Sequence, residues 1–436
     1  MRNASQPARH SVRLTAVATT ALLSLSLGVL PATAATPLPA PAAAAAEATS
    51  PLDRKALRAS LDAIHRAGMY GAYSSVRDGS ERWRGATGVA DVDTRRPMRA
   101  GYEHRIGSIT KTFTSVAVLQ QVAKGRVDLD APIAAHLPDL VTGERGRKVT
   151  VRMLLNHTSG IADYVLPAFP GILVNPRKAL DEGQFRELAP EKLVRLGLAA
   201  QPQAPRGTFA YSNTNYLLAG LLLERVTGQD PEAYITKNVI RKAGLRHTYF
   251  PRSAYVSGPH ARMYESMYGL IEPARDYSVY DMSWAGTAGA MVSTTDDLND
   301  FYRLLLSGKL LGAAELREMK TTVATSPPGQ EEGMRYGLGL FRLRMPSGGW
   351  YWGHNGSVFG AETWALSTED GRRQMSLGYN LTKYQELGDD GMPLPNPIDT
   401  ALVAHMDGAL SGVPAKRTSG PLRTPQHLPL GLRLRP

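Results

Sequence analysis

A serine and a lysine three positions apart provide the first chemical signal in this sequence. Ser108 and Lys111 stand in "GSITKTF", at the start of a helix predicted over about 109–124, where positions i and i+3 share a face. A lysine amine kept neutral by burial can take the proton of a serine hydroxyl, and free N–H groups at a helix start can stabilise an oxyanion. The pair predicts an activated serine. Helix capping by Ser108 is the alternative, and it is favoured for this motif alone.

A second motif, "YSNTN" at 211–215, offers two further polar side chains. The phenol of Tyr211 can move a proton, and the amide of Asn213 can hold a substrate carbonyl or the lysine. Both residues follow a Pro/Gly-rich stretch and precede a helix predicted over 213–227, so we expect them on a turn. Capping of that helix by Ser212 or Asn213 is the alternative.

The third motif, "WGHNGS" at 352–357, is predicted on a strand, where alternation sends His354 and Gly356 to one face. A glycine there lets another backbone approach closely, and the N–H of Ser357 can supply a second oxyanion donor. His354 can contribute positive charge or a proton. A surface histidine beside a β-bulge is the alternative. His157 in "NHTSG" is expected to have a structural, hydrogen-bonding role within a Thr/Ser/Gly turn, and a catalytic role is the alternative.

Taken together, the three motifs stand in an order that chance seldom produces. Similar segments surround them over about residues 55–410, among them "VTVRMLLNHTSGIADY", "SWAGTAGAMVSTTDDL" and "YGLGL". The chain resembles the penicillin-recognising serine hydrolases, which include the serine D-alanyl-D-alanine carboxypeptidases and class C β-lactamases. It is most similar to the secreted carboxypeptidases of Gram-positive filamentous bacteria.

This resemblance implies a β-lactamase/DD-peptidase-like α/β (α+β) fold. Such a fold has a five-stranded antiparallel sheet flanked by helices, an all-helical domain, and an active site in the cleft between them. Ser108 would attack the substrate carbonyl, and Lys111 and Tyr211 would handle protons. Asn213 would bind the substrate amide, and the N–H groups of Ser108 and Ser357 would form the oxyanion hole.

The resemblance also implies further substrate-binding residues around the third motif. His354 would stand where many relatives have lysine, with Asn355 and Gly356 beside it, and Trp284 would line the cleft. The implied partners are D-Ala-D-Ala-type peptides or peptidoglycan fragments, with β-lactam antibiotics as inhibitors or substrates.

Two positions depart from the pattern of the carboxypeptidases. These enzymes often place threonine in the middle of the third motif and arginine just after "GLGL", and both are thought to receive the terminal carboxylate. Here the two positions hold Asn355 and Phe341, while Arg342 and Arg344 are expected on the opposite strand face from Phe341. Acyl transfer at Ser108 is therefore better supported than the D-alanyl-D-alanine carboxypeptidase activity that the motifs favour.

The motifs also leave other activities open. An esterase or a class C-like β-lactamase is the alternative within enzymes. A catalytically silent wall-binding or penicillin-sensing protein would have the same fold, because fold alone does not set activity. The chain has no Gly-x-Ser-x-Gly, His-Glu-x-x-His or P-loop motif and no cysteine, so we expect no thiol chemistry, metal or cofactor.

Hydrophobic periodicity predicts the scaffold. Leu57, Leu61 and Ile64 indicate a first helix, and "AYSSVRDG" and "RWRGATGVADV" read as strands. Further helices are predicted over 294–306 and 398–410. Between those two, the predicted strands are "RYGLGLFRLRM", "GWYWGHNG", "AETWALS" and "RRQMSLGYN". Strands at both ends of the chain around a helical middle suggest two parts. An α/β part is formed by about 51–107 and 283–411, and a helical part at about 108–282 is inserted into it.

Composition and charge limit the size of the core and the kinds of partner that can be expected. The chain has 436 residues, of which 43% are hydrophobic, so it can bury a large core. Its net charge is +11, and removal of residues 1–34, with three arginines and no acid, leaves +8. Such a surface would attract cell-wall polyanions or carboxylate substrates, although solubility alone is an equal alternative. Nucleic acid is not expected, because no compact Lys/Arg run has interleaved aromatics.

The first residues predict export. Arginines precede the apolar run 16–30, and Ala32-x-Ala34 offers a cleavage site, so residues 1–34 read as a signal peptide. A membrane anchor is the alternative, but a bilayer span needs roughly 20 apolar residues. We therefore expect a secreted, extracellular protein with no stable membrane insertion after cleavage. A linker at 35–50 and a Pro/Arg-rich tail at 412–436 are predicted to be disordered.

Overall fold

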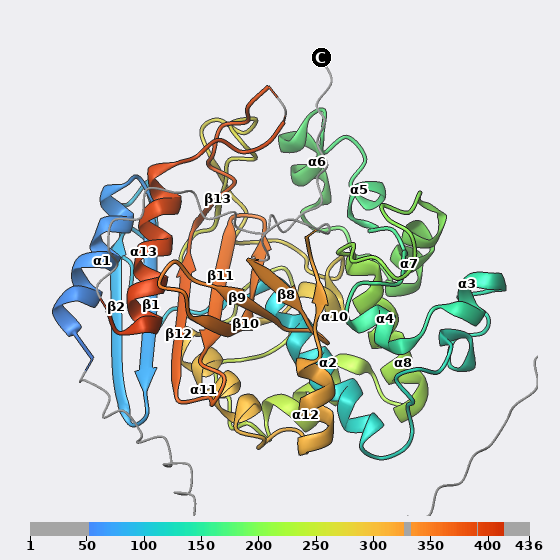
Figure 1. The fold of residues 1–436 in the computed structure, drawn as a ribbon. Coiled ribbons are helices and arrows are strands. Elements are labelled where there is room, and N and C mark those ends of the chain that lie inside the picture. Colours follow the sequence, from blue (N-terminus) through green and yellow to red (C-terminus); the bar gives the residue numbers. More distant parts are fainter. Residues whose placement is uncertain (1–51, 327–332, 390, 414–436) are drawn as a thin grey trace, which may run out of the picture. The chain divides into compact units, whose positions relative to one another are not determined.

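The computed structural model (Figure 1) describes residues 52–326, 333–389 and 391–413. The predicted signal peptide, the linker and nearly all of the predicted C-terminal tail lie outside the described residues. Within the described ranges, no helix is both long and apolar enough to span a bilayer.

An antiparallel sheet organises the described residues. It has eight strands in the order β2-β1-β12-β11-β10-β9-β8-β7. The strand bounds are β1 Gly71–Asp78, β2 Glu81–Gly88, β7 Val323–Ala324, β8 Met334–Tyr336, β9 Phe341–Arg344, β10 Trp350–Val358, β11 Ala361–Ser367 and β12 Arg373–Tyr379. Because the N-terminal hairpin β1–β2 pairs with β12, the two ends of the described chain build one sheet, as the sequence predicts. The mixed α/β class with a large antiparallel sheet is confirmed.

The edge of the sheet beyond β10 differs from expectation. The stretch "RYGLGLFRLRM" was expected to form one strand, but it forms the hairpin β8–β9, in which Tyr336 pairs with Phe341. Gly337 N–H donates to Leu340 O at 2.7 Å, and Gly339 has φ +79°, a conformation that glycine adopts without steric cost. With the hairpin β8–β9 and the short strand β7, the sheet has eight strands, whereas the resemblance implies five.

Helices cover the two faces of this sheet (Figure 1). On one face, α1 (Arg54–Arg66) lies beside α13 (Pro397–Ser411). As predicted, Leu57, Leu61 and Ile64 are the buried residues of α1. On the other face, α11 (Thr295–Leu306) packs against β1, β11 and β12.

Helices and short strands fill the stretch between β2 and β7. The helices are the 3₁₀ helix η1 Gly107–Ile109, α2 Thr110–Val122, η2 Ile133–Ala135, α3 Gly143–Lys148, α4 Val151–Leu155, α5 Val165–Ala168, α6 Pro176–Gly183, α7 Pro190–Ala199, α8 Asn213–Thr227, α9 Pro231–Ile235, the π-helix η3 Thr236–Ile240, α10 Gly286–Gly289 and α12 Ala313–Lys320. The short strands are β3 His104–Arg105, β4 Tyr264–Glu265, β5 Arg275–Asp276, β6 Val292–Ser293 and, near the C-terminus, β13 Leu381–Thr382. The predicted helix over 213–227 is confirmed, and its C-cap Gly228 is left-handed. The division into an α/β part and a helical part stays a prediction.

Two buried histidines predict a loss of stability in acid. Burial lowers the pKa values of His104 and His405 to about 4, whereas histidine in an unfolded chain titrates near about 6.5. Between these values the unfolded state binds more protons, so stability is complete above about pH 6.5 and falls as the pH drops toward 4. We expect each histidine to remove about 3 kcal/mol from the free energy of unfolding.

Urea unfolding measured over this pH range tests the expectation. His405→Leu removes one titrating group, so the variant should lose less stability than the wild type between neutral pH and about pH 4. An identical pH slope in the two proteins would contradict the assignment of His405.

Candidate active site

Ser108 and Lys111 lie in direct contact. Ser108 belongs to η1, and Lys111 is in the first turn of α2. The Nζ atom of Lys111 is 3.0 Å from Ser108 Oγ. No side chain caps η1 or α2, so the hydroxyl of Ser108 does not have the capping role that the motif alone favoured. It is available to the lysine instead.

The other contacts of Lys111 orient its amine. Nζ donates to Asn213 Oδ1 and to the backbone carbonyl oxygen of Ala288 in α10, both at 2.7 Å. A neutral amine has two hydrogens and one lone pair. With both hydrogens given to these two oxygens, the lone pair faces Ser108 and can accept its hydroxyl proton. The geometry therefore suits a general base.

Burial also adjusts the charge of Lys111. The side chain is 0% exposed, and desolvation lowers its pKa to about 7, against the opposing attraction of Asp163. A large fraction of the amine is therefore neutral at physiological pH, which an exposed lysine would not be.

This pKa predicts the pH dependence of the reaction. Because the neutral amine is the active form, we expect the rate of acylation of Ser108 to rise as the pH increases through about 7 and to level off above it. Single-turnover acylation by an activated ester, followed from about pH 5 to 9, measures this profile. A rate that stays constant through neutral pH would contradict the base role of Lys111.

Tyr211 lies over the lysine. Its ring centroid is 5.0 Å from Lys111 Nζ. Burial raises the pKa of the phenol well above 10, and the neighbouring Ser108 hydroxyl partly opposes this shift. No partner with regular hydrogen-bond geometry meets the phenol oxygen among the described residues. A neutral phenol can donate a proton, so this environment favours an acid role for Tyr211 and leaves the base role to Lys111.

Asn213 is held by a carboxylate that the motifs did not include. Its backbone N–H and its side-chain Nδ2 each donate to Asp163 Oδ2 at 2.8 Å. Asp163 is 8% exposed. Sequence reasoning missed this residue, although a lone acid within the apolar stretch "SGIADYVL" is a usable signal, because acids are almost never buried unless paired. The carbonyl of Ala288 could not have been found, because any residue can supply a backbone oxygen.

Two glycines bring the first and third motifs together. A Cβ atom on Gly356 would lie 2.0 Å from Ile106 O and 2.5 Å from the backbone nitrogen of Ser108. A Cβ atom on Gly107, which has φ +48°, would lie 2.8 Å from the nitrogen of Ser357. The backbones of η1 and β10 therefore touch at a point where only glycine fits. The nitrogens of Ser108 and Ser357, which are predicted to form the oxyanion hole, lie on either side of this contact.

His354 lies inside the protein, with a partner for each ring nitrogen. Nδ1 is 2.5 Å from the backbone oxygen of Asn355, and Nε2 is 2.9 Å from the hydroxyl of Tyr336. A neutral ring satisfies both contacts when Nδ1 carries the proton and Tyr336 donates to Nε2. The predicted role of His354 as a positive charge stays a prediction.

Two further predicted substrate-binding residues are buried. Asn355 alternates with Gly356 and pairs with Trp364, so its side chain points to the sheet face opposite Ser108. Among the residues that the structure describes, neither of its side-chain polar atoms has a hydrogen-bond partner. Trp284 packs against Phe169 and Phe359, with ring centroids 5.4 and 5.1 Å away. The substrate-binding roles of both residues stay predictions, and the placement of Asn355 does not favour its role.

His157 supports the loop that carries the second motif. It is fully buried, and its Nδ1 accepts hydrogen bonds from Ser212 N and Asn215 Nδ2, both at 3.2 Å. Its ring centroid is 4.2 Å from that of Tyr211. Burial, followed by the charge of Lys111, lowers its pKa well below 6.5, so it is neutral. These contacts agree with the structural role that the sequence predicts.

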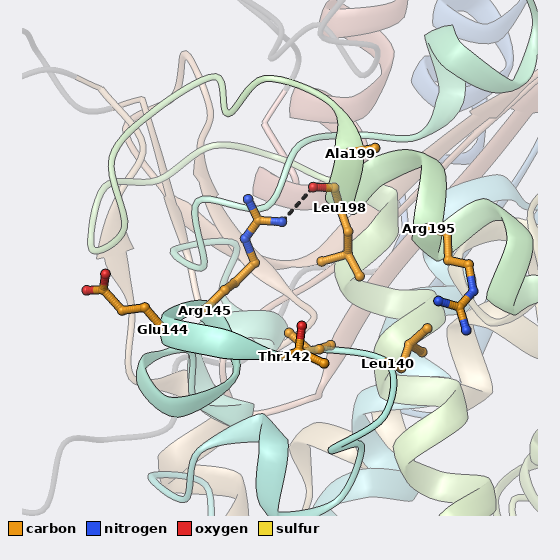
Figure 2. Close-up of a pocket in the computed structure, with 8 residues that line it drawn as sticks. Leu140, Thr142, Glu144, Arg145, Arg195, Leu198 and Ala199 are labelled. Carbon is orange, nitrogen blue, oxygen red and sulfur yellow. Dashed lines mark hydrogen bonds between the residues drawn. The ribbon is translucent and has the colours of Figure 1, made fainter.

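A separate cavity of about 550 Å³ lies between α3 and α7 (Figure 2). Arg145 crosses it, and its Nη1 donates to the carbonyl oxygen of Leu198 at 2.6 Å. The cavity is lined by Leu140, Val141, Thr142, Glu144, Arg145, Arg195, Leu198 and Ala199. None of the residues described above lines it, so the chemistry of Ser108 does not take place there.

Comparison with known proteins identifies a family model and solved structures that the chain resembles. Residues 54–388 match the family model described as Beta-lactamase. A D-stereospecific amidohydrolase from Streptomyces sp. has a similar solved structure, with 37% identity and a TM-score of 0.70 over 76% of this chain and 95% of that one. The D-amino acid amidase of Ochrobactrum anthropi SV3, complexed with L-phenylalanine amide, gives 26% identity and 0.65 over 75% and 91%.

Among curated proteins, the esterase EstB of Burkholderia gladioli is similar. It is 34% identical over 211 residues, which cover 46% of this chain and 53% of EstB. The chain thus spans about half the length of this relative.

Proposed function

Since the chain belongs to the beta-lactamase family and is a serine hydrolase, we propose that it cleaves an amide bond next to a D-amino acid residue through an acyl-enzyme on Ser108. The observation that carries the reaction type is the buried amine of Lys111, 3.0 Å from Ser108 Oγ. The similarity to a D-stereospecific amidohydrolase over 95% of its length supports the proposed configuration of the substrate.

The proposed reaction has two halves. Ser108 Oγ attacks the carbonyl carbon while its proton passes to Lys111, and the N–H groups of Ser108 and Ser357 hold the oxyanion. The C–N bond then breaks. Tyr211 donates its proton to the leaving nitrogen and receives in exchange the proton that Lys111 took from Ser108. Water attacks the resulting ester, so that the acid is released and Ser108 recovers its proton.

The surroundings of the third motif favour a leaving group without a carboxylate. The two positions that are thought to receive the terminal carboxylate in related carboxypeptidases hold Asn355 and Phe341, which are 0% and 1% exposed. A buried phenyl ring cannot pair with an anion. Simple D-amino acid amides and peptide amides are therefore the preferred substrates in this proposal.

D-alanyl-D-alanine carboxypeptidase is the second candidate. It is supported by the order of the three motifs and would act on D-Ala-D-Ala-type peptides or peptidoglycan fragments, with β-lactams as inhibitors or substrates. It requires another group to receive the carboxylate.

One matched pair of peptides separates the two candidates. A peptide ending in D-Ala-D-Ala is compared with the same peptide ending in a carboxamide, by release of the C-terminal residue. We expect hydrolysis of the carboxamide to be at least as fast, and hydrolysis of D-phenylalanine amide but not of its L-enantiomer. A strict requirement for the free carboxylate would establish the carboxypeptidase instead.

Three controls complete the test. Ser108→Ala should abolish every activity, and fluorescent penicillin should label the wild type but not this variant; the absence of both turnover and labelling would indicate a silent binding protein. Activity on only a short-chain ester or only nitrocefin would identify an esterase or a β-lactamase.

Secretion is a further part of this proposal, supported by the features of residues 1–34. N-terminal sequencing of the protein from culture supernatant tests it, with cleavage expected after Ala34. Recovery of the uncleaved chain only in the cell fraction would refute it.

A further inference from the structure

A buried carboxylate outside the three motifs contacts the catalytic residues through Asn213. Asp163 Oδ2 accepts the two hydrogen bonds from Asn213, and Oδ1 accepts the backbone N–H of Val165 at 2.8 Å. All three donors are neutral groups, and Asp163 has no ion pair with an arginine or lysine within the described ranges. A buried negative charge of this kind is costly unless a nearby positive charge compensates it.

The carboxylate decides which way the amide of Asn213 points. Carboxylate oxygens only accept hydrogen bonds, so the NH₂ group of Asn213 must face Asp163 and its oxygen must face Lys111. If the amide turned over, its NH₂ group would meet the amine of Lys111 and two donors would oppose each other. The chain of contacts from Asp163 through Asn213 to Lys111 therefore has one consistent direction.

The compensating positive charge is available during the reaction. Lys111 becomes an ammonium when it takes the proton of Ser108. Desolvation raises the pKa of Asp163 above its ordinary value, and the hydrogen bonds from Asn213 and Val165 and the attraction of Lys111 oppose this rise. In return, desolvation lowers the pKa of Lys111, and the attraction of Asp163 partly opposes this lowering. The other titratable groups that face the amine are Tyr211, Tyr216, His157 and, through His157, His354. Both phenols have raised pKa values and His157 has a lowered one, so these three side chains are neutral.

We propose that Asp163 is a positioning residue of the hydrolase, which orients the Asn213 amide toward Lys111 and supplies the negative charge that balances the protonated lysine during acyl transfer. This inference rests on the proposed roles of Ser108 and Lys111. It assigns a function to the segment "SGIADY", which none of the three motifs includes.

Asp163→Asn separates charge from shape. The amide keeps one oxygen for the two donors of Asn213, loses the hydrogen bond from Val165, and removes the negative charge. Without that charge, a proton on Lys111 is less favourable, so the pH profile of acylation should shift to lower pH by about one unit. The plateau rate should also fall, because a weaker base removes the proton of Ser108 less readily.

The measurement is covalent labelling of Ser108 by a fluorophosphonate, followed by intact mass over pH 5 to 9. This probe reports on the serine and its base whatever the natural substrate is. The control is Asp91→Asn, at a buried carboxylate that accepts backbone N–H groups from Asp93 and Thr94 and, unlike Asp163, forms an ion pair with Arg262 at 2.9 Å. It should leave the midpoint of the profile unchanged.

Two more variants distinguish this role from a merely structural one. Asp163→Glu retains the charge and should keep the midpoint near that of the wild type, although its rate falls. Asp163→Ser is uncharged and replaces the asparagine variant if that one does not fold; it should show the same downward shift.

The outcomes separate the two proposals. If the wild type is not labelled at Ser108, the proposed function fails. If the wild type is labelled and the uncharged variants of Asp163 keep its midpoint, the role of Asp163 is refuted.

Discussion

Lys111→Met is expected to slow the acylation of Ser108 by at least about 10³-fold. Methionine fills a similar volume but cannot accept the proton of the hydroxyl, and the lone pair that faces Ser108 Oγ at 3.0 Å is lost. Single-turnover acylation by an activated ester at about pH 8 measures the effect. At this pH the wild-type amine is mostly neutral, so the difference between the wild type and Lys111→Met measures the full contribution of the base.

The variant must also be shown to fold. Removal of the amine leaves Asn213 Oδ1 and the carbonyl of Ala288 without their donor, and each such buried acceptor costs about 1–3 kcal/mol. Against this, the desolvation cost of the amine disappears. Circular dichroism and thermal unfolding serve as controls, and a folded variant that acylates within tenfold of the wild-type rate would refute the base role.

Gly356→Ala is expected to reduce acylation by at least about 10²-fold, the usual loss when one oxyanion-hole donor is removed. The new methyl group would lie 2.0 Å from Ile106 O and 2.5 Å from the nitrogen of Ser108. Because both neighbours are backbone atoms, β10 and η1 must move apart, and the N–H groups of Ser108 and Ser357 then no longer converge. The overpacking should also lower the free energy of unfolding by about 1–3 kcal/mol.

Gly333→Ala provides the matched control. A Cβ atom at this position has no neighbour within 4 Å, and its φ is not in the left-handed region, so rate and stability should both be unchanged. The ratio kcat/KM and the urea midpoint are compared for the three proteins. Wild-type kcat/KM in Gly356→Ala would show that the contact between β10 and η1 does not position the oxyanion hole.

Much of the local structure could be predicted because its causes are short-range. The helix over 213–227 begins at a turn and ends at Gly228, and α4 is capped by Thr150, whose hydroxyl accepts a hydrogen bond from Met153 N. The buried face of α1 follows from its periodicity. The hairpin β8–β9 was missed, although the sequence signals it: Gly337 and Gly339 mark a turn, and the alternation of apolar residues changes phase between Leu340 and Phe341.

The sequence by itself determined which side chains are available for chemistry and in what order they occur: Ser108 with Lys111, then Tyr211 and Asn213, then the His-x-Gly strand. Tertiary structure alone decided that Lys111 is fully buried, that Asp163 and the carbonyl of Ala288 reach its surroundings, and that Asn355 faces away from Ser108. The reason is physical. A side chain's type is encoded at one position, whereas desolvation and Coulomb attraction at Lys111 are sums over atoms that come from segments more than 40 residues away in the chain.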